Sequence, residues 1–198
     1  TEDMQQLGLT NTFWAGYFSL GAPLLQDFET PANQRSDYVT DPDRYGQTTP
    51  EDLGLLLEDI YYCARDGGGS LPLVFAGEIN QAECQMMVQY LALNKIGVLI
   101  QAGVPADVQV AHKHGYTYDT ISDAGVELSP GGDYVLVMFL WSDVDWLAGT
   151  AFPLMEGIST ATFNYFNPDL INAPRQGYGD ALAPQDLPDD GADASDEG

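Results

Sequence analysis

The sequence predicts an α/β (α+β) fold in which helices flank an antiparallel sheet. Two segments have the start signals and apolar spacing of helices, the first beginning at Thr49 and the second at Asn80. From Val108 onward the apolar pattern changes to that of strands, with Pro130-Gly131-Gly132 as a hairpin connection. Helices that precede a run of hairpin-connected strands are typical of this fold class.

The first 48 residues contain few periodic apolar positions. Residues 2–8 have the pattern of a short helix that the chain enters without an initiator methionine. Residues 10–48 are rich in Gly, Pro, Asn, Asp and Thr, which predicts a long surface loop. Loops of this length inside compact domains tend to be functional.

The first long helix has clear boundary signals. Thr49 can cap it, Pro50 suits its first position, and Glu51 and Asp52 lie at the positive end of its dipole. Gly67 and the two glycines after it end the helix. Its predicted buried face has helical spacing and comprises Leu53, Leu56, Leu57, Ile60, Tyr61 and Ala64.

The second long helix is predicted over residues 81–93. Asn80 and Glu83 have the spacing of a capping box, and Cys84 belongs to the apolar stripe that follows. Cys63 lies near the end of the preceding helix, so a disulfide to Cys84 is feasible in an oxidising compartment; two small buried thiols are the alternative. Two cysteines and two nearby histidines do not form ligand pairs of a zinc site, so we expect no metal.

Residues 135–140 are apolar enough for a central strand covered on both faces, and residues 153–166 form a last helix that should pack against the sheet. Beyond Asn172 large apolar residues almost disappear, and such a segment cannot offset its own ordering entropy. We therefore expect residues 1–172 to form one partial domain and residues 173–198 to be a disordered acidic tail.

The chain is strongly acidic. Its formal net charge is -24, from 30 acidic and 6 basic residues. Nucleic acid is therefore not an expected partner, because phosphate binding needs clustered Lys and Arg. The sequence lacks the run of about 18 apolar residues that a transmembrane helix needs, so none is expected in this chain. Any targeting segment is expected upstream of Thr1.

Lys113, His114 and Gly115 resemble the K-T-G motif of the penicillin-recognising serine hydrolases, with histidine in place of threonine. These are the class A β-lactamases and the penicillin-binding proteins. Residues 7–12 (L-G-L-T-N-T), 48–50 (T-T-P) and 103–105 (G-V-P) resemble further segments of that family in the same order. The family's S-x-x-K and S-D-N motifs are absent from the chain. The resemblance thus implies the C-terminal part of such an enzyme, with the N-terminal half of the domain missing.

The resemblance also implies a role for each residue of this strand. Lys113 would bind the carboxylate of the substrate and support proton transfer, as a compact positive charge can. His114 would donate a hydrogen bond to the same carboxylate, and Gly115 would let the substrate approach the strand. Tyr116 would contribute its backbone N–H to the oxyanion hole.

The region 10–48 resembles the omega loop of the family. Class A β-lactamases place a glutamate there to activate the deacylating water, and in this chain Asn33 falls near that position. Glu29 or Asp37 could replace the glutamate as catalytic base if either reaches the acyl ester directly or through one water. If neither does, the parent protein would be acylated by penicillin and would hydrolyse it slowly.

The family resemblance implies an intact parent that acts on β-lactams or related acyl-peptides through an acyl-serine intermediate. It would work without a cofactor, outside the cytoplasm, secreted or attached to the cell surface, and in the response to antibiotics. Its partners would be a β-lactam or peptidoglycan-like peptide and the missing N-terminal half. The isolated chain is expected to be inactive. The alternative is a non-catalytic, penicillin-binding-like module for cell-surface binding or scaffolding.

Overall fold

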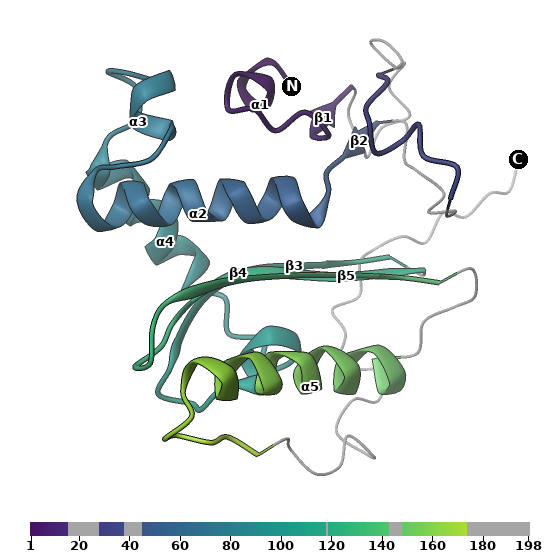
Figure 1. Ribbon diagram of the computed structural model, residues 1–198, viewed down its shortest axis with the longest axis vertical. Helices are drawn as coiled ribbons and strands as arrows, with labels where there is room; N and C mark the ends of the chain where they lie inside the picture. The colour runs from purple at the N-terminus through teal and green to yellow at the C-terminus, as the bar shows by residue number, and fades with distance from the viewer. Residues whose placement is uncertain (16–27, 38–44, 118, 143–147, 174–198) are drawn as a thin grey trace, which may run out of the picture.

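The computed structural model describes residues 1–15, 28–37, 45–117, 119–142 and 148–173. Its central sheet lies between two layers of helices, with α2 and α4 over one face and α5 and the short η1 helix over the other (Figure 1). The elements in chain order are α1 (Glu2–Gln6), β1 (Phe13–Trp14), β2 (Gly46–Gln47), α2 (Pro50–Asp66), α3 (Leu71–Val74), α4 (Gln81–Leu91), η1 (Leu99–Gly103), β3 (Gln109–Tyr116), β4 (Thr120–Leu128), β5 (Tyr134–Trp141) and α5 (Ala148–Phe166).

The capping signals of the two long helices are confirmed. The Thr49 hydroxyl accepts a hydrogen bond from the Asp52 N–H at 3.1 Å, and Gly67 ends α2 in the left-handed conformation with a φ of 77°. At the start of α4, Asn80 and Glu83 form both hydrogen bonds of a capping box. These caps satisfy terminal backbone groups that a helix cannot satisfy itself.

The sheet is antiparallel and has the strand order β3-β4-β5. Successive side chains on a strand point to opposite faces, so each strand contributes to both cores. On β5, Val135 and Val137 pack toward α2, and Leu136 packs toward α5. The core between the sheet and α5 is the larger one, with Leu99, Ile100, Val104, Val110, Ile121, Met138, Ala151, Phe152, Met155 and Phe163.

β5 has both faces covered, as predicted. It is an edge strand of the described sheet, in which β4 is central, and its central place in an intact sheet stays a prediction. One sequence prediction was wrong: the last helix begins at Ala148 and not at Pro153, so Pro153 lies inside it. Proline removes one hydrogen bond from a helix, but burial of Ala151 and Phe152 stabilises the turn that precedes it.

The region 10–48 is closed at its two ends, where β1 pairs with β2 in the register Phe13↔Gln47. The buried Asp52 carboxylate reinforces this closure, accepting hydrogen bonds from the Asn11 N–H and the Thr12 hydroxyl, both at 2.8 Å. Residues 16–27 and 38–44 of this region lie outside the described residues, as do residues 174–198 of the predicted tail.

A disulfide joins Cys63 on α2 to Cys84 on α4, and both cysteines are fully buried. The disulfide thus holds together α2 and α4, the two helices that cover one face of the sheet. No helix in the part of the chain that the structure describes is long and apolar enough to cross a membrane.

Candidate functional site

The open edge of β3 brings together the residues that resemble the K-T-G motif. β3 pairs with β4 on one side and is an edge strand of the described sheet. The Thr117 N–H just beyond β3 donates to the Thr120 carbonyl at 2.7 Å, so it points toward β4. Backbone groups alternate in direction along a strand, so the N–H and carbonyl of Tyr116 point outward, away from β4.

Lys113 lies on the face of β3 that looks toward α2. It pairs in register with Ala124, which packs against Leu57 of α2. The side chain is exposed, and its ammonium donates to the His114 carbonyl at 2.5 Å. Lys113 therefore places a positive charge next to the outward-pointing backbone of the edge.

His114 follows Lys113 on β3, so its half-buried side chain points to the opposite face of the sheet. Its Nδ1 lies 3.2 Å from the side-chain nitrogen of Asn94, in the turn after α4. The ring stacks on that of Tyr116, with the centroids 6.2 Å apart and the planes 11° from parallel. Burial lowers the pKa of the His114 imidazole; Lys113 and His112 also lower it, and Asp123 partly opposes them. His114 is thereby favoured in its neutral form.

A buried histidine–aspartate pair, which sequence reasoning missed, joins β3 to β4. His112 and Asp123 are both fully buried, and Nδ1 of the histidine lies 2.9 and 3.0 Å from the two carboxylate oxygens. The carboxylate also accepts the Ile100 N–H at 3.1 Å, which ties η1 to the sheet. The hairpin register places Gly125 opposite His112, where a Cβ would lie 2.6 Å from the histidine Cβ.

Gly115 sits in register with Ser122, whose hydroxyl donates to the Gly115 carbonyl at 3.2 Å. A Cβ at Gly115 would lie 3.4 Å from that hydroxyl oxygen, at the limit of ordinary contact. The sheet therefore leaves limited room for a side chain here. The role of Gly115 in admitting substrate remains a prediction.

The two candidate catalytic bases lie in the separate segment 28–37, and both are exposed. Asp37 is held in an ion pair with Arg35, whose hydrogen bond lowers the pKa of the carboxyl group. Asn33 shapes the segment: its side-chain oxygen accepts the Thr30 N–H at 2.9 Å. Among the described residues no hydrogen bond or ion pair joins Glu29 or Asp37 to Lys113.

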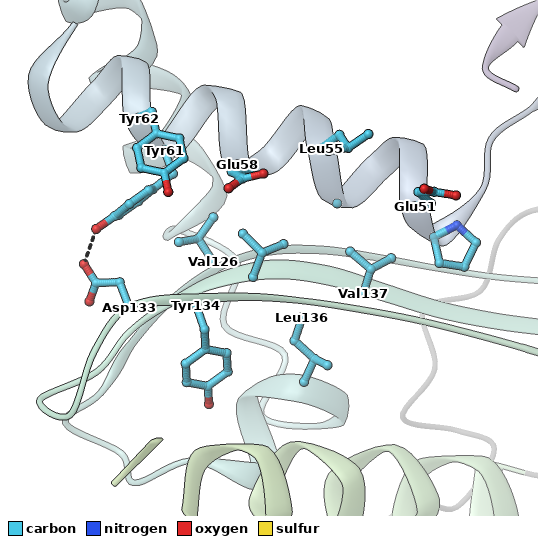
Figure 2. A pocket seen from close by; sticks show the side chains of 13 residues that line it. Glu51, Leu55, Glu58, Tyr61, Tyr62, Val126, Asp133, Tyr134, Leu136 and Val137 are labelled. Atoms are coloured by element: carbon cyan, nitrogen blue, oxygen red, sulfur yellow. Dashed lines mark hydrogen bonds between the residues drawn. The ribbon is translucent and has the colours of Figure 1, made fainter. Parts of the chain in front are cut away.

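A second feature is a groove of about 650 Å³ between α2 and β5 (Figure 2). Glu51, Leu55 and Glu58 of α2 line one wall, and Val137 of β5 lies on the other. At one end the Tyr61 hydroxyl donates to Asp133 at 2.7 Å. The groove contains none of the residues singled out on β3, so it is a separate surface.

Within the described ranges, no cluster of three or more His, Cys, Asp and Glu side chains has the arrangement of a metal site. The β3 edge presents one ammonium, one imidazole and outward-pointing backbone donors and acceptors, a set suited to binding a carboxylate and a developing oxyanion.

The model of the beta-lactamase enzyme family matches residues 2–166. The chain belongs to the beta-lactamase enzyme family. The match covers the segments 7–12, 48–50 and 103–105 and the β3 strand that resemble the penicillin-recognising hydrolases. No curated protein sequence matches the chain.

Solved beta-lactamases and related proteins share this fold at low sequence identity. A class A beta-lactamase from Bacteroides cellulosilyticus matches with a TM-score of 0.57 and 18% identity, over 85% of this chain and 53% of that one. PBP-A, in an acyl-enzyme complex with penicillin G, matches with a TM-score of 0.55 and 19% identity, over 84% and 50%. A beta-lactamase from Sphaerobacter thermophilus has a TM-score of 0.54 and 18% identity, over 84% and 52%.

This chain therefore spans about half the length of the beta-lactamase structures it matches. The mixed fold with an antiparallel sheet is confirmed, and the coverage is consistent with a missing half.

Proposed function

We propose that this chain is the C-terminal part of a β-lactamase-like serine hydrolase that reacts with β-lactams or related acyl-peptides through an acyl-serine intermediate. The observation that carries the proposal is the open edge of β3, where the Lys113 ammonium is bonded to the His114 carbonyl and the backbone of Tyr116, two residues further on, also points outward. The family match supports the same conclusion.

In this proposal Lys113 attracts the substrate carboxylate and His114 donates a hydrogen bond to it. The Tyr116 N–H supplies one donor of the oxyanion hole, and the nucleophile's own N–H, outside this chain, supplies the other. Gly115 keeps the edge accessible. The chain needs no cofactor for these roles, because its contribution is to bind and to stabilise charge.

The missing N-terminal half would dock against β5 and α2. β5 has the apolar pattern of a strand buried on both faces, yet it leaves one edge unpaired in the described sheet. The groove between β5 and α2 runs along this edge, and the exposed Leu55 lies in it. Open strand edges beside apolar surface are sites where a further strand pairs.

Glu29 is the better of the two candidate bases. A general base must accept a proton near neutral pH, and the pairing of Asp37 with Arg35 stabilises its charged form and makes it a weaker base. Glu29 is exposed and has no such partner among the described residues. In an intact protein that deacylates, Glu29→Gln should slow release of the acyl group more than Asp37→Asn does.

The proposed compartment is extracytoplasmic. The Cys63–Cys84 disulfide supports this, because disulfides persist in oxidising environments. Fractionation of the producing cells, with non-reducing electrophoresis of each fraction, tests this compartment. A reduced protein retained in the cytoplasm would contradict it.

The decisive test of function is covalent labelling of the complete gene product with benzylpenicillin, followed by intact-mass measurement. We expect a mass increase equal to one penicillin, and none with the isolated 198-residue chain. Lys113→Ala should slow labelling by at least about tenfold, the scale of a lost hydrogen bond to a charged group. Lys95→Ala is the matched control, since Lys95 is exposed and is the only other lysine of the chain.

The alternative is a non-catalytic, penicillin-binding-like module for cell-surface binding or scaffolding. A complete gene product without a nucleophilic serine would favour this alternative. Reversible penicillin binding without a mass increase would support a binding module, and no binding at all would leave only the scaffolding role. Either result would contradict the acyl-serine mechanism.

A further inference from the structure

The two histidines of the chain, both on β3, have different neighbours. The His112 side chain is buried against the sheet, with Nδ1 in hydrogen-bond contact with the two carboxylate oxygens of Asp123. A carboxylate accepts hydrogen bonds, so Nδ1 of His112 carries a proton. Its Nε2 is buried and has no hydrogen-bond partner among the described residues. Because its side chain is fully buried, His112 does not reach a ligand at the surface.

The environment of His114 requires the opposite arrangement. The side-chain nitrogen of Asn94 lies 3.3 Å from the His112 carbonyl oxygen. A carbonyl can only accept, so the atom that faces it must be the NH₂ group of the amide, and this fixes which way Asn94 points. The same NH₂ group lies 3.2 Å from Nδ1 of His114. Since an amide NH₂ only donates, Nδ1 must accept and cannot carry a proton.

Nε2 of His114 is then the nitrogen that carries the proton. Among the described residues, the hydrogen bond of the His114 ring is made by Nδ1 and not by Nε2. The ring is held in place on one side by Asn94 and on its face by Tyr116. A fixed, unused donor thus lies at the same strand edge as the Lys113 ammonium.

We propose that Asn94 is a positioning residue that holds His114 as the neutral Nε2–H tautomer, and that it thereby supplies the donor with which His114, in the proposed function, binds the substrate carboxylate. The identity of the ligand rests on the proposed function, whereas the tautomer does not. Asn94 thereby lets His114 act as a neutral hydrogen-bond donor where the K-T-G motif has a threonine hydroxyl, so no second positive charge is added beside Lys113.

The charged and titratable groups acting on His114 favour the neutral state. Lys113 on the same strand and His112 beneath it lower its pKa, as burial does, and only Asp123 of β4 acts in the other direction. The neutral ring is also the one that the Asn94 contact requires, because an imidazolium has a proton on both nitrogens and would face the amide NH₂ with a donor.

The first experiment reads the tautomer directly. The complete gene product is labelled with ¹⁵N-histidine, and long-range ¹H–¹⁵N correlation spectra are recorded near pH 7, with assignment by loss of signals in His112→Gln and His114→Gln. We expect the proton on Nε2 in His114 and on Nδ1 in His112. A proton on Nδ1 of His114, alone or with one on Nε2, would overturn the proposal.

Substitution of Asn94 tests its positioning role in the same spectra. Asn94→Ala should change the tautomer ratio of His114 by about fivefold, the scale of one hydrogen bond. The spectrum of His112 should stay as it is. Asn164→Ala is the matched control, because among the described residues the Asn164 side chain on α5 bonds to backbone groups of Asn172 and to no histidine. An unchanged His114 spectrum in Asn94→Ala would contradict the role of Asn94.

The second experiment asks what the donor binds, using benzylpenicillin and its methyl ester, which lacks the anionic carboxylate. His114→Ala should slow acylation by penicillin by about tenfold and change acylation by the ester little. His114→Gln, which retains an N–H donor near the Nε2 position, should stay within about threefold of the wild type. Asn94→Ala should weaken binding of penicillin more than it lowers the limiting acylation rate.

The possible failures are distinguishable. If neither compound forms an adduct, the proposed function fails and so does the carboxylate contact, while the spectra still decide the tautomer. If adducts form but His114→Ala slows penicillin and its ester equally, the proposed function stands and the carboxylate contact is wrong.

Discussion

At the scale of single residues, Gly125 leaves the space that the buried His112 occupies. A Cβ at this position would lie 2.6 Å from the His112 Cβ and 3.1 Å from the Ala111 carbonyl oxygen. Gly125→Ala must therefore displace the neighbouring strand, and we expect it to destabilise the complete gene product by about 2 kcal/mol, measured by guanidinium unfolding.

Gly54 provides the control for this substitution. A Cβ at Gly54 would meet only the Val137 methyl group at an ordinary 3.7 Å. Gly54 lies inside α2, where alanine is favoured over glycine, so Gly54→Ala should raise stability by about 0.5–1 kcal/mol. Equal effects of the two substitutions would mean that His112 does not depend on the space at Gly125.

Glu127 is a buried carboxyl group that makes stability depend on pH. Burial raises its pKa to about 8; the hydrogen bond from the Tyr134 hydroxyl opposes this rise and Asp123 adds to it. The folded state therefore binds a proton that the unfolded state has released between about pH 4.5 and 8. Because the unfolded state binds fewer protons there, stability falls as pH rises through this range.

Glu127→Gln removes this titration and keeps an oxygen that can accept from Tyr134. We expect the variant to match the wild type near pH 5 and to exceed it near pH 8.5 by a few kcal/mol, because each tenfold change in proton affinity between the folded and unfolded states is worth about 1.4 kcal/mol. The check is the unfolding midpoint in guanidinium at the two pH values. A stability difference that does not change with pH would contradict the buried, protonated state of Glu127.

At the scale of elements, the Cys63–Cys84 disulfide fixes α2 to α4. It closes a loop with a sequence separation of 21 residues. Closing such a loop lowers the conformational entropy of the unfolded chain, and this stabilises the folded state by about 3 kcal/mol. Replacing both cysteines with alanine should lower the free energy of unfolding by that amount, and reductant should then have no further effect on the variant. A variant as stable as the oxidised wild type would show that the helices are held by packing alone.

Local signals predicted some elements and tertiary contacts decided others. The boundaries of α2 follow from Thr49, Pro50 and Gly67, whose backbone preferences act within one turn. The start of α5 does not, because burial of Phe152 outweighs the local cost of Pro153. A sequence pattern can show that both faces of a strand are covered, but not whether its edges are paired.

The candidate site shows the same division. Lys113 and Gly115 could be found because they belong to a motif contiguous along one strand. The Asp123 partner of His112 depends on the register of a hairpin, and Asn94 depends on how the turn after α4 lies against the edge of β3. Neither relation has a fixed spacing in the sequence, so the structure was needed to reveal them.

At the scale of the whole molecule, the chain has a high charge and an incomplete surface. Thirty acidic residues against six basic ones give a net charge of -24, and this self-repulsion opposes the compact state. The groove along β5 and exposed side chains such as Leu154, Ile158 and Tyr165 on α5 leave apolar area in contact with water. Both effects reduce the stability of the isolated chain, and a docked N-terminal half would cover part of this area.

We therefore expect the isolated 198-residue chain to unfold without a sharp transition and to bind a hydrophobic dye. Mixing it with the separately produced upstream half should give one cooperative thermal transition and lower the dye signal, because burying the β5 edge and its groove couples the two parts. The complete gene product is the control, and addition of salt to the isolated chain separates charge repulsion from exposed apolar surface. A sharp cooperative transition of the isolated chain at low salt would contradict the need for a partner half, since its own two cores would then suffice.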